Sequence, residues 1–173
     1  MTGRGKVLLI GMMGAGKTTT GHLLAARLGV PYLDSDDEVL RRTGRSVPEI
    51  WHADGEAAFR AQEAAVLADA VAGDEAAVVS VAGGAVLDPA NRELIGRAAA
   101  VVWLRARPET LAERVGAGEG RPLLDGDPAS ALRRLEEVRR PLYEQLATMV
   151  VDVDRLSPQE VAERIADALG AAR

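Results

Sequence analysis

The segment Gly11–Thr18, with the sequence GMMGAGKT, constrains the fold of this chain more than any other. It matches the phosphate-loop pattern G-x-x-x-x-G-K-[S/T] at every fixed position. The apolar run Val7–Ile10 before it is typical of a buried parallel strand, and Leu23, Leu24 and Leu28 after it recur at helical spacing. A strand, a glycine loop and a helix N-terminus in this order predict an anion site, because backbone N–H groups and the helix dipole favour negative charge at one place.

The same segment predicts how a nucleotide would be held. Lys17 would reach the β- and γ-phosphates, and the Thr18 hydroxyl would ligate Mg²⁺. The alternative is a chance glycine-rich turn between a strand and a helix. The match at all fixed positions, with the correct flank on both sides, favours a nucleotide-binding protein.

Composition narrows the class of protein. The 173 residues, of which 47% are hydrophobic, suffice for one domain over residues 1–173 with a full core. The absence of cysteine rules out disulfides and thiolate metal sites, and two histidines are too few for a zinc cluster. A net charge of −5 and 3% aromatic residues disfavour nucleic-acid binding. No apolar run has the roughly 18–20 residues of a membrane span, and no signal-peptide core precedes the first strand. We therefore expect a cytoplasmic protein.

Apolar runs and helical patterns alternate along the chain, which is typical of parallel strands joined by crossover helices. About eight helices are expected, several with capping signals such as Ser46 with Glu49 and Ser157 with Glu160. The expected strands lie at residues 7–10, 32–33, 77–81, 99–104 and 149–151. These elements predict a three-layer α/β/α fold with a five-stranded parallel sheet. Ligands of such sheets bind at the carboxyl ends of the strands, so the phosphate loop, Asp34–Asp36 and Gly83–Gly84 should converge on one cleft.

Absent motifs separate the nucleotide-binding classes. Guanine-specific GTPases read the base with N-K-x-D, but the only asparagine here, Asn91, is followed by Arg92. Motor ATPases usually hold the Mg²⁺ shell with an acid at the end of an apolar strand, and residues 80–84 after the third strand contain none. Asp34, at the end of the second strand, is assigned that task. A small-molecule kinase fits best.

Such a kinase needs a site for the acceptor. Asp36 lies two residues beyond Asp34, so in extended backbone both side chains would face the same side. One carboxylate can serve the metal shell while the other accepts the proton of the acceptor hydroxyl. Alternatively, both are helix-start acids that only favour the helix dipole.

Arginines complete the candidate site. Residues 116–124 are rich in glycine and poor in apolar residues, which predicts a mobile lid whose Arg121 would close over the transferring phosphate. Arg60 and Arg139 would flank the acceptor cleft, where a pair of arginines suits a substrate carboxylate. The alternative for each is the surface position that most arginines occupy.

An ordered series of segments follows the phosphate loop. It comprises LDSD (33–36), GRSVPEIW (44–51), DGEAAFR (54–60), AGGAV (82–86), RPLL (121–124) and RRPLY (139–143). Many ATPases share the loop, but this series is far more specific, and it resembles the shikimate kinase family over nearly the whole chain.

The resemblance implies an ATP:shikimate 3-phosphotransferase of the nucleoside-monophosphate-kinase fold that acts in aromatic amino-acid biosynthesis, with Mg²⁺ and with ATP as co-substrate. It implies catalytic roles for Lys17, Asp36 and Arg121, and a metal shell of Thr18 and Asp34. Acceptor-binding helices at about 36–62 would help to hold shikimate. Its ligands would be Asp36, Arg60, Gly83, Gly84 and Arg139. ATP would contact Gly14, Ala15, Gly16, Lys17, Thr18, Thr19, Arg114, Arg121, Arg155 and Pro158. We expect a monomer whose partners are these two small molecules.

One position departs from the family pattern, and two other functions stay open. Ala82 stands where the family usually has glycine; alanine would be strained if the position needs φ > 0, although we expect it to be tolerated. A gluconate kinase of the same fold would also bind a carboxylate and vicinal hydroxyls. A nucleotide-dependent switch without an acceptor would have little use for Asp36 or Arg121.

Overall fold

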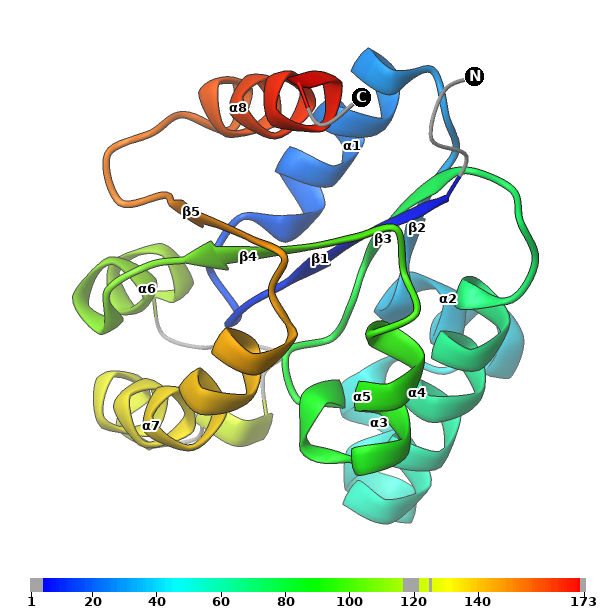
Figure 1. Cartoon of the computed structure of the whole chain (residues 1–173). Helices are drawn as coiled ribbons and strands as arrows, with labels where there is room; N and C mark the ends of the chain where they lie inside the picture. Colours follow the sequence, from blue (N-terminus) through cyan, green and yellow to red (C-terminus); the bar gives the residue numbers. More distant parts are fainter. Residues whose placement is uncertain (1–4, 117–121, 125, 172–173) are drawn as a thin grey trace.

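A parallel sheet runs through the middle of the computed structural model, which describes residues 5–116, 122–124 and 126–171 (Figure 1). The order across the sheet is β2-β3-β1-β4-β5, and all the neighbouring strands are parallel. The strands are β1 (Lys6–Ile10), β2 (Tyr32–Asp34), β3 (Ala77–Ser80), β4 (Ala100–Arg105) and β5 (Met149–Asp152). Their ends lie within one residue of the expected bounds. The α/β prediction with a five-stranded parallel sheet is confirmed.

Helices cover both faces of this sheet. Figure 1 shows α1 and α8 on one face and α4, α5 and α7 on the other, which completes the three-layer arrangement. The α-helices are α1 (Lys17–Leu28), α2 (Ser35–Thr43), α3 (Val47–Asp54), α4 (Glu56–Val71), α5 (Pro89–Ile95), α6 (Pro108–Val115), α7 (Pro128–Leu146) and α8 (Pro158–Ala171). Short 3-10 helices are η1 (Ala85–Leu87) and η2 (Pro122–Leu124). None of the helices in the described part of the chain has the uninterrupted apolar length that a membrane crossing needs.

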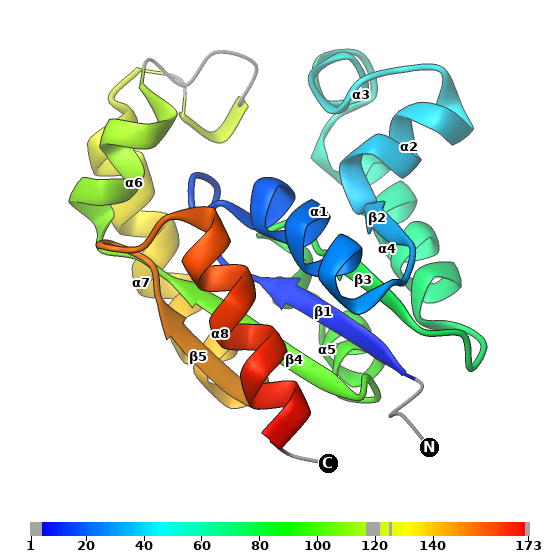
Figure 2. The same cartoon turned by 90° about the horizontal axis from the view of Figure 1, so that it is seen from above.

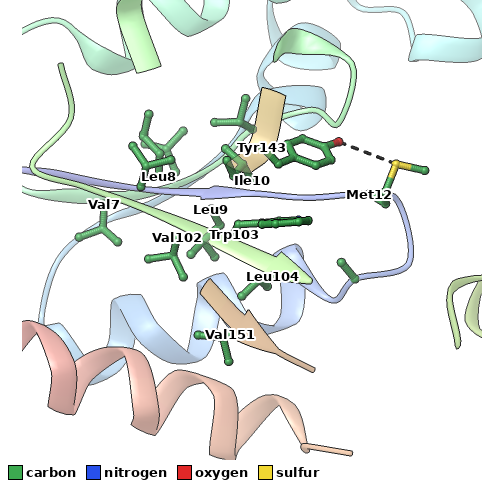
Figure 3. Close-up of a cluster of buried hydrophobic side chains, with 14 of the residues drawn as sticks. Val7, Leu8, Leu9, Ile10, Met12, Val102, Trp103, Leu104, Tyr143 and Val151 are labelled. Atoms are coloured by element: carbon green, nitrogen blue, oxygen red, sulfur yellow. Dashed lines mark hydrogen bonds between the residues drawn. The ribbon is translucent and has the colours of Figure 1, made fainter. Parts of the chain in front are cut away.

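The apolar runs of the central strands form the main core. Leu8, Leu9 and Ile10 of β1 and Val102 of β4 are almost completely buried, and Trp103 packs beside them (Figure 3). Strands covered on both faces need apolar side chains at successive positions, which explains why these runs are continuous rather than alternating.

A second, smaller buried cluster lies apart from the sheet. Val39, Ile50, Phe59 and Val66 form it, and they come from α2, α3 and α4. These helices therefore have a core of their own beside the sheet. Seen from above, α2 and α3 lie on one side of the carboxyl end of the sheet and α6 lies on the other (Figure 2).

Local capping signals define where the helices begin. The Ser46 N–H donates to Glu49 Oε2 (2.6 Å), and the Glu49 N–H donates to Ser46 Oγ (3.4 Å), which forms the expected capping box. Ser157 and Glu160 form the same reciprocal pair before α8, with distances of 2.7 and 3.2 Å. Each pair satisfies backbone donors that the first turn of a helix leaves without a partner.

Candidate active site

The phosphate loop joins the carboxyl end of β1 to the N-terminus of α1. Gly14 and Gly16 have φ angles of 83° and 90°, a region that glycine adopts without strain. Gly16 is the N-cap of α1 and, as a glycine, provides no side chain to accept from the first turn of this helix. Lys17 Nζ donates to the Gly11 and Met12 carbonyl oxygens at 2.7 and 3.1 Å, so the lysine lies across the loop. The loop thus directs backbone donors and one cation to one place.

Asp34 connects this loop to the next strand end. The Thr18 hydroxyl donates to Asp34 Oδ2 at 3.0 Å, and the Asp36 backbone N–H donates to Asp34 Oδ1 at 3.0 Å. Asp34 is therefore the N-cap of α2 and a neighbour of Thr18 at the same time. Oδ1 of Asp34 therefore caps the helix, as the helix-start alternative expected, whereas Oδ2 faces Thr18 after the phosphate loop glycines.

The argument that placed Asp36 beside Asp34 was wrong, although both residues line one cleft. Asp36 lies in the first turn of α2 and not in extended backbone, because Asp34 ends β2 and caps the helix immediately. The alternation of side chains along a strand therefore does not apply. A helical turn at the carboxyl end of β2 directs Asp36 to the cleft instead.

Arg60 of α4 lines the cleft and is paired with a buried acid. Its Nη1 donates to both carboxylate oxygens of Glu63, at 2.8 and 3.0 Å, and the Glu63 side chain is 1% exposed. Burial raises the pKa of Glu63, and the charge of Arg60 opposes that shift. The guanidinium also lies 5.7 Å from the Trp51 ring and 5.2 Å from the Phe59 ring. Glu63, Trp51 and Phe59 also line the cleft but were not predicted from the sequence. For Glu63, the one local signal was its spacing of three residues from Arg60, which places the two side chains on the same face of a helix.

Arg139 of α7 is the most buried of the described cations that line the cleft, with 1% of the residue exposed. Its Nη1 contacts Met12 Sδ at 3.9 Å, and its Nε has no hydrogen-bond partner among the described residues. The buried Tyr143 hydroxyl, next to the same sulfur (Figure 3), donates to the Gly83 carbonyl oxygen at 2.7 Å. Burial raises the pKa of Tyr143 to about 12. A buried cation is costly unless an anion meets it, so this end of the cleft favours an anionic ligand.

Gly83 and Gly84 form the turn between these two arginines. A Cβ on Gly84 would lie 2.5 Å from Arg60 Nη1, and a Cβ on Gly83 would lie 3.1 Å from Arg139 Nη1. A side chain at either position would require the arginine guanidinium to shift. Ala82 before them is unstrained, because no described residue other than glycine has a positive φ, and its N–H donates to Ser35 Oγ at 2.9 Å. Alanine at this position therefore brings no backbone strain.

The residues expected near the adenine are only partly at the cleft. Arg114 lines it, with Nη1 3.3 Å from the Gly14 carbonyl oxygen and Nη2 3.1 Å from that of Val153. In the described part of the chain, neither Arg155 nor Pro158 is among the cleft-lining residues. Arg155 lies in the connection from β5 to α8, and Pro158 is the first residue of α8. Arg121 is outside the described residues, and of the expected lid at about 116–124 the structure describes Gly116 and Pro122–Leu124.

These segments enclose one cleft of about 580 Å³. It reaches from the phosphate loop to the two arginines, and α2, α3 and α4 form one of its walls. Its lining includes Gly14, Gly16, Lys17, Thr18, Thr19, Asp34, Asp36, Trp51, Phe59, Arg60, Glu63, Gly83, Gly84, Arg114, Pro122, Leu123 and Arg139. Ala15 belongs to the loop but is buried in the main core.

The donor set at the nucleotide end fits Mg²⁺. This ion keeps several waters and takes one or two protein ligands together with substrate phosphates. A threonine hydroxyl 3.0 Å from a carboxylate oxygen, next to a phosphate loop, provides that set. Among the described residues no group of three or more His, Cys, Asp or Glu side chains could hold a metal by itself.

Comparison with known proteins shows one family for this chain. A family model described as shikimate kinase matches residues 13–170. The shikimate kinase of Symbiobacterium thermophilum is 47% identical over 167 residues, which are 94% of this chain and 95% of the relative. A solved structure of shikimate kinase from Acinetobacter baumannii in complex with shikimate superposes with a TM-score of 0.93. It is 34% identical and covers 98% of this chain and 94% of its own.

A gluconokinase is also similar, but at a greater distance. The solved structure from Sinorhizobium meliloti has a TM-score of 0.66 and 22% identity, and the match covers 99% of this chain and 95% of that one. This similarity shows a shared fold alone.

Proposed function

The chain belongs to the shikimate kinase family, and we propose how its residues transfer the γ-phosphoryl group of ATP to the 3-hydroxyl of shikimate. The observation that carries the proposal is the arrangement of the cleft. Residues of the phosphate loop, the carboxylate of Asp36 and the two arginines Arg60 and Arg139 line the same cleft. This arrangement suits a substrate with a carboxylate at one end and a reacting hydroxyl toward the nucleotide.

At the nucleotide end, the loop would hold ATP. The backbone N–H groups of Gly14, Ala15 and Gly16 and the start of α1 would bind the phosphates, because the helix dipole and the glycine backbone favour anions there. Lys17 would leave the carbonyl oxygens that it now contacts and neutralise the β- and γ-phosphates. The bound ATP would also contact Thr18, Thr19 and Arg114. Its adenine would lie near Arg155 and Pro158.

The Thr18–Asp34 pair would hold Mg²⁺ through the threonine oxygen and the carboxylate. When bound, this ion neutralises charge that develops on the phosphate oxygens during transfer. The Thr18 hydroxyl proton already points to Asp34, which leaves a threonine lone pair for a cation.

At the acceptor end, Arg139 and Arg60 would bind the shikimate carboxylate, and the Gly83–Gly84 turn would lie against the ring. Two guanidinium groups match the planar geometry of a carboxylate. Glu63 would hold Arg60 in place, because it fixes the guanidinium from the buried side. The ring faces of Trp51 and Phe59 would exclude water from the carbon skeleton of the acceptor.

Asp36 would act as the general base. Its carboxylate would accept the 3-hydroxyl proton as the acceptor oxygen forms a bond to the γ-phosphorus and the bond to the β–γ bridging oxygen breaks. The products are shikimate 3-phosphate and ADP. Arg121, assigned from the sequence alone, would approach from the proposed lid at about 116–124 and stabilise the charge of the transferring group.

We also propose one P-loop kinase domain over residues 1–173 that works as a cytoplasmic monomer in the chorismate pathway. The main buried cluster draws on elements from β1 to α8, which supports a single domain. One copy of the chain supplies both ends of the cleft, which supports a monomer. Light scattering of the purified protein would measure the mass, 18.2 kDa for one copy.

The acceptor is tested by measuring ADP release from Mg-ATP with shikimate, gluconate, AMP, CMP or no acceptor in parallel. Gluconate is the strongest competitor, since a polyol acid also presents a carboxylate and vicinal hydroxyls. We expect turnover confined to shikimate. Turnover with gluconate or a nucleotide, and none with shikimate, would discard the acceptor assignments. ADP release that is equally fast without an acceptor would instead indicate a nucleotide switch.

A further inference from the structure

Tyr32 is placed to touch the carboxylate that we assign to the metal shell. Its hydroxyl lies 3.1 Å from Asp34 Oδ2 and 2.9 Å from Ser80 Oγ. From the sequence, this tyrosine was expected only to occupy a position in a strand. The structure shows that it joins the ends of β2 and β3 to the nucleotide side of the cleft.

The position of the Tyr32 hydroxyl is fixed by packing on several sides. The backbone of Tyr32 pairs with Val78 in the sheet, and its ring lies 4.0 Å from that of His22 on α1. Gly21 of α1 makes room for the ring, since a Cβ there would overlap its Cε2 atom. The ring can therefore not swing away without moving α1 or β3.

The available acceptors indicate where the hydroxyl protons of Ser80 and Tyr32 are donated. Ser80 has one hydroxyl proton, and it is donated to the Lys17 carbonyl oxygen at 3.1 Å. The phenol of Tyr32 also has one proton, and both groups within reach of it, Ser80 Oγ and Asp34 Oδ2, are left as acceptors. The carboxylate is the stronger acceptor because it is charged.

Asp34 consequently has a donor on each side. Oδ2 faces the hydroxyls of Thr18 and Tyr32, and Oδ1 accepts from the Asp36 N–H. Without the phenol, the cap bond on Oδ1 would remain, but Oδ2 would be held only by the exposed Thr18 side chain. The carboxylate could then rotate about the cap bond and leave the metal shell.

We propose that Tyr32 is a positioning residue for the Mg²⁺ shell, acting through Asp34. The inference rests on the proposed role of Asp34 and deepens it. Tyr32 touches neither substrate nor the ion; its hydroxyl keeps Asp34 Oδ2 beside the Thr18 hydroxyl, so that both oxygens are in place when the Mg²⁺–nucleotide complex arrives.

The test is the effect of Mg²⁺ on ADP affinity, measured by isothermal titration of the full chain with MgCl₂ or with EDTA. Tyr32→Phe removes one oxygen and keeps the ring. We call the factor by which Mg²⁺ tightens ADP binding the Mg²⁺ factor. In Tyr32→Phe we expect it to fall about tenfold, which is the effect expected for the loss of one hydrogen bond to a charged group. The affinity for ADP in EDTA should stay within about twofold, and the Mg²⁺ concentration for half-maximal activity should rise by a similar tenfold.

Tyr143→Phe is the matched control, because it removes the same atom from a buried tyrosine at the acceptor end. It should raise the KM for shikimate and leave the Mg²⁺ factor unchanged. Ser80→Ala is the second variant. It removes the competing acceptor and leaves Asp34 as the partner of the Tyr32 hydroxyl, so the Mg²⁺ factor should not fall.

Two results would overturn the inference. The Mg²⁺ factor of Tyr32→Phe could equal that of the wild type, either with both ADP affinities unchanged or with both weakened equally, and the second case is the signature of a structural role. Ser80→Ala could lower the factor as much as Tyr32→Phe does. The variant Asp34→Asn tests the proposed role of Asp34 separately from that of Tyr32. A normal Mg²⁺ factor in Asp34→Asn would show that Asp34 itself is not part of the metal shell.

Discussion

Arg139→Lys tests the acceptor end of the cleft most directly. The change keeps a positive charge in the same buried place but replaces a planar fork by a single ammonium group. If Arg139 binds the shikimate carboxylate through two N–H groups, the lysine would lose one of the two bonds. Because Arg139 is only 1% exposed, water cannot replace the missing donor easily.

The size of the effect follows from that burial. A hydrogen bond to a charged group contributes about 1.5–3 kcal/mol, so losing one should raise the KM for shikimate roughly tenfold to hundredfold. The turnover number should change much less, because the carboxylate lies away from the reacting hydroxyl and is bound equally in the ground state and the transition state.

Steady-state kinetics with shikimate and with its carboxamide analogue would check the reasoning. The wild type should discriminate strongly against the neutral carboxamide, and Arg139→Lys should discriminate less, because part of the charge recognition is already lost. Arg140→Lys is the matched control: this neighbour on α7 is half-exposed and paired with Glu136, and its kinetics should stay within about twofold of the wild type. Equal discrimination by Arg139→Lys and the wild type would refute carboxylate binding by Arg139.

Three further changes test other parts of the structure. Asp36→Asn should lower kcat on the order of 10²-fold and leave ATP binding intact, since it removes the proton acceptor; near-normal kcat in single-turnover assays would contradict the role. Gly84→Ala should raise the KM for shikimate several-fold, because its methyl group would push against the Arg60 guanidinium, and an unchanged KM would speak against the close approach. The hydrogen bonds from Arg41 and Arg42 lower the pKa of Glu38 to about 2, below its usual value near 4.3. These bonds therefore stabilise the fold above about pH 4.3. Their contribution to stability is lost as the pH falls toward 2. Glu38→Gln should therefore lower the Tm at pH 7 by a few degrees, and thermal melts should show the difference shrinking below pH 4; a difference independent of pH would rule out the charge as its cause.

The sequence predicted the elements of the fold well because their signals are local. Continuous apolar runs marked the central strands, and side-chain caps such as Ser46 and Ser157 marked where helices begin. Each of these features involves residues only a few positions apart, so tertiary packing has little opportunity to override them.

Positions in the cleft were predicted with mixed success. Asp34 and Asp36 both line it, but the expected strand geometry was wrong for Asp36, because Asp34 caps a helix that begins at Ser35 and residues 35 and 36 are therefore not extended. The backbone geometry of a short segment between two elements depends on which of the competing local structures is more stable, and here the Asp34 cap stabilises the helix.

The sequence by itself determined the phosphate loop, the parallel sheet and the family, since each depends on residue types at fixed spacing. Only the tertiary structure decided which side chains meet across distant segments. It buries Arg139 and exposes Arg140, pairs Arg60 with the buried Glu63, and brings the Tyr32 hydroxyl to Asp34 through the space that Gly21 leaves. Burial and contact across the sheet are set by how whole helices pack on it, and no local pattern of residues encodes that packing.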